Sequence, residues 1–434
     1  MKVQKAKNLL SVGFAAVSQL MAAVVLCPCF GAGQRFPVEL KPGDRVAMLG
    51  DSITAQKSYT RYLETYLELC SGVKDLSFMQ FGWPGGTAPH AIERMPDDVL
   101  GYKPTVTTVM FGINDGKYKP YSDSIALPYK TNLVTIARML KAAGSRALFL
   151  SPSTMDPTYK DATAFMDALN KMSDRCREAA DEEGASFADV NALHESVQNK
   201  LIAERGKEKC KFSPDGCHDY PIGHFIMLAA ALDGFKLDGR IAELTLDAKT
   251  GKATASEGHK VVSSEAGKAT FESTRYPFCF RPNPKSFGED IAAALPYLDF
   301  QEKHNRFVLK VTGLDAAEAK VGWTDAEGKS VSKTFARAEL EKGVNLADAF
   351  RDNPFVAPFY AYFDKALDKE YFEVDYTCTV VPFWKWTKEA TGKDLKEKFR
   401  PLWADLLKEQ ARRMAELKKL HVPVTHTITV EPVK

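Results

Sequence analysis

The sequence has 434 residues, with 45% apolar and 26% charged side chains and a formal net charge of +2, which becomes −1 without the three lysines near its N-terminus. This length predicts one large domain or two smaller ones, and the composition excludes a disordered chain, a collagen-like repeat and a coiled-coil rod. The near-zero charge gives no electrostatic reason to expect nucleic acid or an anionic membrane as a partner.

The first segment of the chain has the pattern of a leader. Three lysines lie within the first seven residues, followed by the apolar run "NLLSVGFAAVSQLMAAVVLC" and the small residues of "CFGAG". A basic start, an apolar middle and a small-residue end are typical of a secretory signal peptide. We therefore predict a signal peptide over residues 1–33 and a secreted or periplasmic protein with no stable membrane span after its removal.

Two other interpretations of the leader stay open. The apolar run approaches the length that spans a bilayer, so it could be a permanent N-terminal anchor. Lipoprotein processing at Cys27 or Cys29 is disfavoured, because Leu26 and Pro28 are poor neighbours for that reaction.

Six cysteines remain after the leader. In an exported protein an even number permits disulfides, although the sequence alone cannot pair them. Cys210 and Cys217 are the favoured pair because they are close in the chain. The six are Cys70, Cys176, Cys210, Cys217, Cys279 and Cys378.

From residue 45 to about 235, short apolar runs alternate with longer amphipathic ones. The apolar runs are "RVAMLG", "LSFMQFG", "TVTTVMFG", "RALFLSPS" and "ASFADV", with helical stretches such as "YTRYLETYLELC" between them. Strands that alternate with helices predict an α/β fold, a parallel sheet covered by helices on both faces. Ligands of such sheets bind at the carboxyl ends of the strands, where Ser52, Gly82 and Gly112 fall. We assign residues 34–238 to this α/β domain.

Residues 239–434 form a different, accessory region. "IAELTLDAKTGKATASEGHKVV" and the C-terminal "VPVTHTITV" alternate as strands do, whereas "TKEATGKDLKEKFRPLWADLLKEQARRMAELKKL" predicts a helix bent or broken before Pro401. The region is therefore expected to mix strands and helices. The aromatic run "PFVAPFYAYF", residues 354–363, is interpreted as core and, less favourably, as a glycan platform.

Four short segments carry residues suited to chemistry. They are "GDSIT" at 50–54, "GWPGGTA" at 82–88, "FGIND" at 111–115 and "PDGCHDYPIGH" at 214–224. Each is weak evidence alone, because a polar turn after a strand is common. Their order and their positions at strand ends favour a common site.

Together these segments can supply an activated serine. A serine becomes a nucleophile beside a base, and the base needs a partner that fixes its tautomer. Asp215 and His218, three residues apart, can lie on one turn, with the imidazole between the carboxylate and Ser52. Backbone N–H groups at Ser52 and at a close glycine, and an asparagine amide, would bind an oxyanion.

The set resembles the SGNH, or GDSL-type, hydrolase family, whose blocks contain Ser, Gly, Asn and His in this order. The GDSxT block matches Ser52, "PGGTA" places Gly85 at the second block, and GxND and DxxH match Asn114, Asp215 and His218. The resemblance covers about residues 45–235. It implies a three-layer α/β/α, flavodoxin-like fold.

The resemblance also implies the role of each residue. Ser52 would be the nucleophile, His218 its base and Asp215 the group that orients His218. The N–H groups of Ser52 and Gly85 and the side chain of Asn114 would form the oxyanion hole, and no cofactor or metal is implied. Activity should then fall as the pH drops and His218 becomes protonated.

Two departures qualify the match. A polar residue commonly follows the glycine of the second block, so Gly86 remains an alternative oxyanion donor. The G-x-S-x-G pattern of nucleophile elbows is absent, because Thr54 occupies its last position, which argues against an ordinary α/β-hydrolase.

The residues indicate the substrate less directly than they indicate the chemistry. The resemblance implies a short-chain esterase, favouring acetyl esters of carbohydrate, with a small-molecule or polysaccharide ester as partner. A lipid or aryl esterase and an acyltransferase are alternatives on the same site, since the first half-reaction is identical. A non-catalytic glycan-binding protein would not need the full set of residues, and the oligomeric state stays open.

Two further interpretations concern neighbouring residues. Cys210, Cys217, His218 and His224 could be a zinc cluster, but their spacing does not match the usual patterns. His224 is better explained by helix packing or capping. Trp83 could line the site, although an aromatic near a turn is as often packing.

Overall fold

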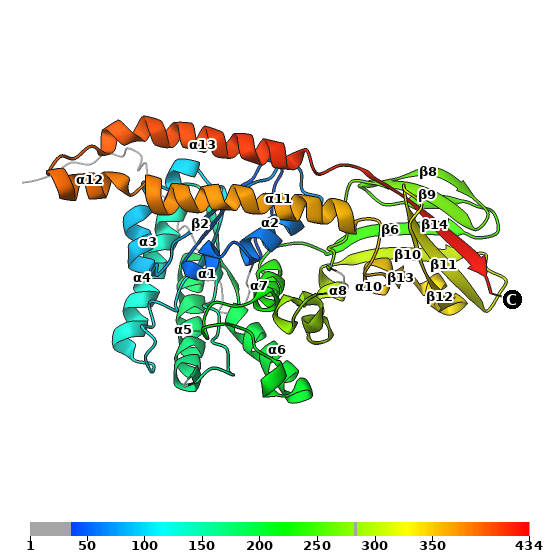
Figure 1. The fold of residues 1–434 in the computed structure, drawn as a ribbon, viewed down its shortest axis with the longest axis horizontal. Helices are drawn as coiled ribbons and strands as arrows, with labels where there is room; N and C mark the ends of the chain where they lie inside the picture. Colours follow the sequence, from blue (N-terminus) through cyan, green and yellow to red (C-terminus); the bar gives the residue numbers. More distant parts are fainter. Residues whose placement is uncertain (1–35, 161, 282–283, 434) are drawn as a thin grey trace, which may run out of the picture. The chain divides into compact units, whose positions relative to one another are not determined.

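The computed structural model describes residues 36–160, 162–281 and 284–433, and Figure 1 shows how their helices and strands are arranged. The predicted signal peptide, residues 1–33, lies outside the described residues. Within the described ranges, no helix combines the length and the apolar character needed to cross a bilayer.

The first half of the chain is built on a five-stranded parallel sheet. The spatial order β2-β1-β3-β4-β5 reverses direction between β1 and β3, and ligands of parallel sheets bind at the carboxyl edge beside such a switch point. The strands are β1 (Arg45–Gly50), β2 (Ser77–Gly82), β3 (Val106–Met110), β4 (Arg146–Leu150) and β5 (Ser186–Ala188).

Helices cover both faces of this sheet because its central strands are apolar on both sides. Along β1, Val46 and Met48 pack on one face and Ala47 and Leu49 on the other. The first face is covered by α2 (Tyr59–Leu69), α6 (Val190–Arg205) and α7 (Pro221–Asp233), the second by α3 (Ala88–Arg94), α4 (Asp123–Ala142) and α5 (Ala162–Glu183). The expected three-layer α/β/α fold is confirmed.

From residue 240 the chain forms two further sheets, as the alternation of its sequence indicates. One has the order β13-β10-β6-β7 and the other β12-β11-β14-β9-β8. Aromatic rings join the two sheets, because the ring of Phe307 on β10 lies 5.4 Å from Trp323 on β11 and 6.0 Å from His426 on β14. The strands are β6 (Arg240–Asp247), β7 (Ala253–Ala255), β8 (His259–Glu265), β9 (Lys268–Ser273), β10 (Arg306–Thr312), β11 (Glu318–Asp325), β12 (Ser330–Ala336), β13 (Val344–Asn345) and β14 (Val424–Pro432).

Four helices separate β13 from β14, namely the short α10 (Leu346–Ala349), α11 (Val356–Asp375), α12 (Phe383–Thr391) and α13 (Lys396–Lys418), with a π-helical turn, Tyr376–Val380, after α11. The helical stretch is broken before Pro401, as expected, but the break lies at Gly392, whose φ of 71° ends α12. Pro401 itself lies inside α13.

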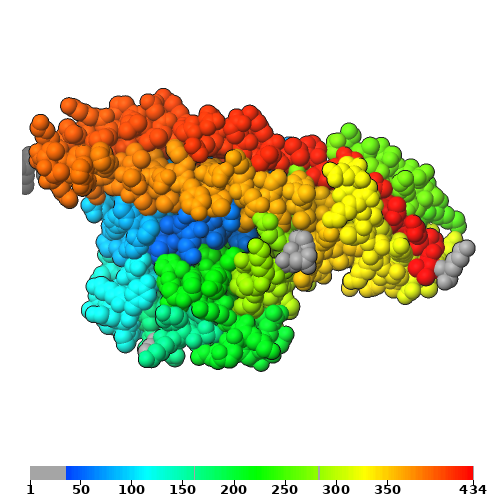
Figure 2. Space-filling model, viewed as in Figure 1, coloured from blue at the N-terminus to red at the C-terminus, as the bar shows by residue number. Residues whose placement is uncertain are grey.

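The helices α11 and α13 run side by side and cover the free edge of β2 (Figures 1 and 2). The N–H of Gln80 donates to the Glu373 carboxylate at 3.1 Å, and the Gln410 side chain donates to the Phe78 carbonyl at 2.7 Å. Side chains thus bond the edge groups that a further strand would otherwise pair. The aromatic run of residues 354–363 is core, because Phe355, Phe359 and Tyr362 are fully buried.

The boundary between residues 238 and 239 stays a prediction. It falls between α7, which ends at Asp233, and β6, which begins at Arg240, while the described residues form one compact unit.

Candidate active site

Ser52 follows the carboxyl end of β1, where the chain turns into the short helix α1 (Ser52–Ala55). A Cβ on Gly50 would lie 2.0 Å from Oγ1 of Thr54 and 2.8 Å from the Met110 carbonyl oxygen, so only glycine fits there. Thr54 is held over Gly50 by a 2.8 Å hydrogen bond between its hydroxyl and that of Tyr59. The glycine and threonine of the "GDSIT" segment therefore pack together to fix the turn that presents Ser52.

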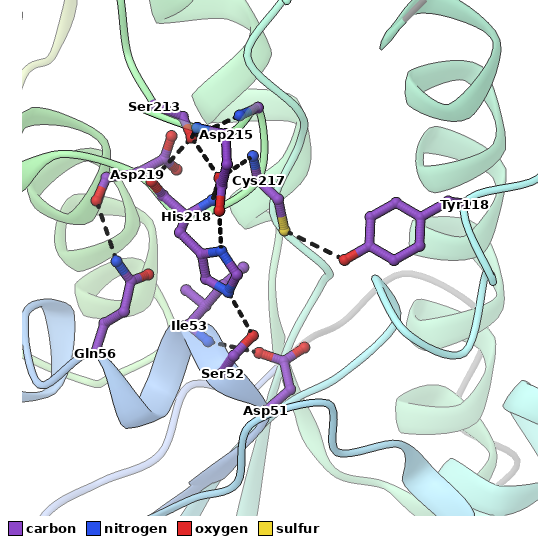
Figure 3. A network of polar contacts seen from close by, with 11 residues as sticks. Asp51, Ser52, Ile53, Gln56, Tyr118, Ser213, Asp215, Cys217, His218 and Asp219 are labelled. Atoms are coloured by element: carbon purple, nitrogen blue, oxygen red, sulfur yellow. Dashed lines mark hydrogen bonds and ion pairs between the residues drawn. The ribbon is translucent and has the colours of Figure 1, made fainter.

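Ser52, His218 and Asp215 form a continuous relay (Figure 3). Nε2 of His218 lies 2.8 Å from Oγ of Ser52, and Nδ1 lies 2.6 Å from Oδ2 of Asp215. Oδ1 of Asp215 also accepts the backbone N–H of His218 at 2.8 Å. The structure thus brings Ser52 together with His218, 166 positions away in the sequence, and the Asp215 carboxylate fixes both the ring and the backbone of the histidine.

The turn that carries Asp215 and His218 is held by two residues that the sequence analysis missed. Oδ2 of Asp156 accepts the N–H groups of Phe212 and Ser213 at 2.9 and 3.0 Å. The hydroxyl of Ser213 lies 3.0 Å from Oδ1 of Asp215 and 2.9 Å from the carbonyl oxygen of His218. Ser213 lies next to the DxxH block, but no sequence pattern marks Asp156.

Asp215 is an ionised group in this setting. Partial burial alone would raise the pKa of Asp215, but hydrogen bonds from the N–H and ring of His218 and from the N–H of Cys217 outweigh it and hold the pKa well below its usual range. The side chains of Asp215 and His218 are 51% and 33% exposed. The relay therefore combines a stable carboxylate with an imidazole that solvent and substrate can reach.

Two of the three predicted oxyanion donors, Gly85 and Asn114, lie on loops that touch each other. The N–H of Gly86 donates to the Trp83 carbonyl at 2.8 Å, and Gly85, between them, has a φ of 71°, a turn with Pro84 and a glycine at its two central positions. Because the Gly86 N–H is already bonded within this turn, the geometry favours Gly85 over Gly86 as the donor to the oxyanion. Nδ2 of Asn114 donates to the Gly86 carbonyl at 3.0 Å, which leaves its second N–H for an oxyanion.

Two buried carboxyls lie beneath these loops. Asp51 accepts the N–H of Ile53 at 2.9 Å, and Asp115 accepts the N–H of Ala88 at 2.9 Å. Burial raises the pKa of Asp51 to about 7, with the charge of Asp115 adding to the effect, and burial raises the pKa of Asp115 to about 6. Both residues belong to the matched blocks: Asp51 caps the first turn of α1, and Asp115 ties the loop after β3 to the start of α3.

The favoured disulfide between Cys210 and Cys217 is wrong. All six cysteines of the described residues are free thiols. Sγ of Cys210 lies 3.4 Å from the Leu201 carbonyl oxygen, whereas Sγ of Cys217 lies 3.7 Å from the hydroxyl of Tyr118. The two sulfurs face different neighbours, so the catalytic turn is held by Asp156 and Ser213 and not by a cross-link.

The remaining expectations around the site concern metal binding and packing. Across the described part of the chain, no three His, Cys, Asp or Glu side chains are grouped to hold a metal ion. His224 is fully buried within α7 and stacks on Tyr59 at 6.3 Å, which confirms its interpretation as a packing residue. Trp83 packs edge-on against His90 at 4.7 Å.

A hydrogen-bonded Ser–His–Asp relay on a parallel three-layer fold is an arrangement that serine hydrolases use. Residues 48–224 match the model of the GDSL-like lipase/acylhydrolase family. This part of the chain belongs to that family, and the protein is a hydrolase of ester bonds.

One of the solved structures shows the same fold over most of this chain. A gut microbial diltiazem-metabolizing enzyme is 21% identical, with a TM-score of 0.71 over 92% of this chain and all of the other. Thus the hydrolase and accessory regions share a fold with that enzyme. An acetylxylan esterase from Geobacillus stearothermophilus is 18% identical over 45% of this chain and 96% of its own, with a TM-score of 0.38. A hydrolase from the metagenome of Lake Arreo, Spain, is 20% identical over 45% of this chain and 96% of its own, with a TM-score of 0.37. No curated protein matches the chain.

Proposed function

We propose that the protein is an exported serine esterase that removes short acyl groups, above all acetyl, from carbohydrate through an acyl-enzyme on Ser52. One observation carries the proposal: the side chains of Ser52, His218 and Asp215 are joined by hydrogen bonds of 2.8 and 2.6 Å at the carboxyl end of β1. Export rests on the signal-peptide pattern of residues 1–33.

Each residue then has a defined role. Oγ of Ser52 attacks the ester carbonyl while Nε2 of His218 takes its proton, and the ionised Asp215 stabilises the resulting imidazolium. The negative oxygen of the tetrahedral intermediate is bound by the N–H groups of Ser52 and Gly85 and the amide of Asn114. His218 returns the proton to the leaving alcohol, and a water activated by the same imidazole then releases the acid.

The openness of the site supports a short acyl group on a bulky alcohol. Pro84 and Gly85, beside the oxyanion position, are exposed, and Asp215 is half exposed. An open site admits an ester carried on a polymer. A long acyl chain needs an apolar channel, because each buried methylene contributes about 0.8 kcal/mol to binding.

The test is the hydrolysis of p-nitrophenyl esters from acetyl to dodecanoyl by the wild type and by Ser52→Ala. We expect the highest kcat/KM for acetyl and a loss of roughly a million-fold in kcat in the variant, with an unchanged thermal melting curve. A preference for long chains would instead indicate a lipid esterase, and transfer to an added sugar in preference to water an acyltransferase. Turnover that survives in Ser52→Ala would contradict the mechanism.

A further inference from the structure

The loop after β3 has a strained backbone next to the site. It contains Asn114, and its hydrogen-bonded turns run from Gly112 to Lys119. Two consecutive residues that are not glycine, Lys117 and Tyr118, have φ values of 56° and 54°. Such conformations are costly for residues with a side chain, and they persist where the surroundings impose them, often at functional sites.

Packing and a polar contact together orient the Tyr118 side chain. Its ring lies 5.1 Å from that of Phe165 on α5, and a Cβ on Gly116 would lie 2.7 Å from the Phe165 ring, so the loop closes tightly on this support. Its hydroxyl lies 3.7 Å from Sγ of Cys217. Figure 3 shows the phenol pointing at the turn that carries Cys217 and His218.

Tyr118 is nevertheless 52% exposed. A large aromatic residue held in a strained backbone, yet half open to solvent, contributes little to a core. The thiol of Cys217 is a weak hydrogen-bond partner, so the phenol can exchange it for a better one. Partial burial, the Cys217 thiol and the carboxylates of Asp51 and Asp215 raise the pKa of Tyr118, so the hydroxyl keeps its proton and remains a donor.

The chemistry of the relay fixes which part of the ester lies near Tyr118. The leaving oxygen must be within hydrogen-bond reach of Nε2 of His218, which protonates it. The carbonyl oxygen must face Asn114 and Gly85. Tyr118 lies on the loop of Asn114 and contacts the residue before His218, so its exposed ring borders the space that receives the alcohol.

A second aromatic ring flanks the same turn. A Cβ on Gly216 would lie 2.7 Å from ring carbons of Tyr159, which is 46% exposed. The turn of Asp215 and His218 is therefore bordered by two half-exposed tyrosines. Flat aromatic faces and phenol hydroxyls suit the C–H faces and hydroxyls of a sugar.

We propose that Tyr118 determines specificity for the alcohol part of the ester, packing its ring on a sugar ring and donating its hydroxyl to a sugar hydroxyl. This inference rests on the proposed esterase function and adds the residue that selects the alcohol.

The experiment keeps the acyl group fixed and varies the alcohol. Acetate release from ethyl acetate and from a methyl xyloside that carries a single acetyl group and keeps its other hydroxyls free is measured for the wild type, Ser52→Ala, Tyr118→Phe and Tyr118→Ala. Tyr121→Phe is the matched control, because Tyr121 lies three residues further on and its hydroxyl bonds Asp123 instead. We expect Tyr118→Phe to lower kcat/KM for the acetylated sugar roughly 5- to 10-fold, mostly through KM, and to leave ethyl acetate unchanged. Tyr118→Ala should lower kcat/KM for the acetylated sugar further, and Tyr121→Phe should leave kcat/KM unchanged for both esters.

The outcomes separate this inference from the proposed function. Absence of serine-dependent acetate release from both esters by the wild type would overturn the proposed function and the role of Tyr118 with it. The role of Tyr118 alone would be overturned by two results, both with serine-dependent acetate release in the wild type. In the first, the Tyr118 variants lose kcat/KM equally on both esters, and in the second they lose it on neither.

Discussion

The carboxyl edge of the parallel sheet and the free edge of β2 are both rich in charged groups, but they hold them in opposite surroundings. At the carboxyl edge, Asp215 and His218 are neighbours in the chain and are 51% and 33% exposed. At the β2 edge, Lys369 of α11 is 2% exposed and lies 2.9 Å from Glu64 and 2.5 Å from Glu373, both fully buried. The first cluster can exchange protons with a substrate, whereas the second joins distant segments. Substitutions should therefore change turnover in one region and stability in the other.

Of the substitutions that test this comparison of the two edges, Asp215→Asn has the largest expected effect, which is on turnover. The amide can still accept backbone N–H groups, but it cannot fix the reactive tautomer of His218 or stabilise its positive charge. We expect kcat to fall about 10⁴-fold with little change in the free energy of unfolding. Steady-state kinetics on p-nitrophenyl acetate and urea unfolding measure the two quantities, and a fall of less than tenfold in kcat would contradict the assigned role.

Lys369→Met tests whether the buried charges at the free edge of β2 stabilise the fold. Removing the cation leaves Glu64 and Glu373 as unpaired buried carboxyls, and burial already raises the pKa of Glu64. We expect a loss of about 3–5 kcal/mol in the free energy of unfolding, with kcat unchanged in the protein that remains folded. Lys365→Met is the matched control, because Lys365 lies one turn earlier on α11 and pairs with Asp368 in solvent. If both variants unfold at the same urea concentration, the buried cluster does not stabilise the fold.

A smaller effect is expected for the buried Asp115. Its pKa is raised to about 6 from an ordinary value of 3.8, so the folded protein holds this proton more tightly than the unfolded chain. The stability it contributes is complete below pH 4 and is lost as the pH rises through 6.

Asp115→Asn removes this titration but keeps the acceptor for the Ala88 N–H. Between pH 4 and 7, the free energy of unfolding of the wild type should therefore decline more than that of the variant, by up to about 3 kcal/mol. Urea unfolding at four or five pH values measures the difference, with the exposed Asp167→Asn as control. Parallel pH profiles would show that Asp115 titrates normally in the folded protein.

The sequence predicts most of the site because its central residues lie in short local motifs. Gly50 and Thr54 are fixed by mutual packing within one turn, and Asp215 and His218 by bonds within one turn. The alternation of strands and helices then places Ser52 at the carboxyl edge of the sheet. The parallel fold and the position of Ser52 follow from the same local patterns.

What the sequence does not predict depends on contacts between distant segments. Asp156 supports the turn of His218 from 57 residues away, and no pattern connects it with Ser213. Cys210 and Cys217 are close in the chain but face different partners, so proximity in sequence gave a wrong disulfide. The sequence likewise does not predict that α11 covers β2, because the bonded residues Gln80 and Glu373 are 293 residues apart.

The central claim is that Ser52 carries the acyl group during turnover. Rapid mixing with p-nitrophenyl acetate, acid quenching and mass spectrometry of the digested protein measure this directly. We predict a burst of p-nitrophenol matched by one acetyl group on the peptide that contains Ser52, and neither in Ser52→Ala. An acetyl group on another residue, or a burst that persists in the variant, would contradict the account.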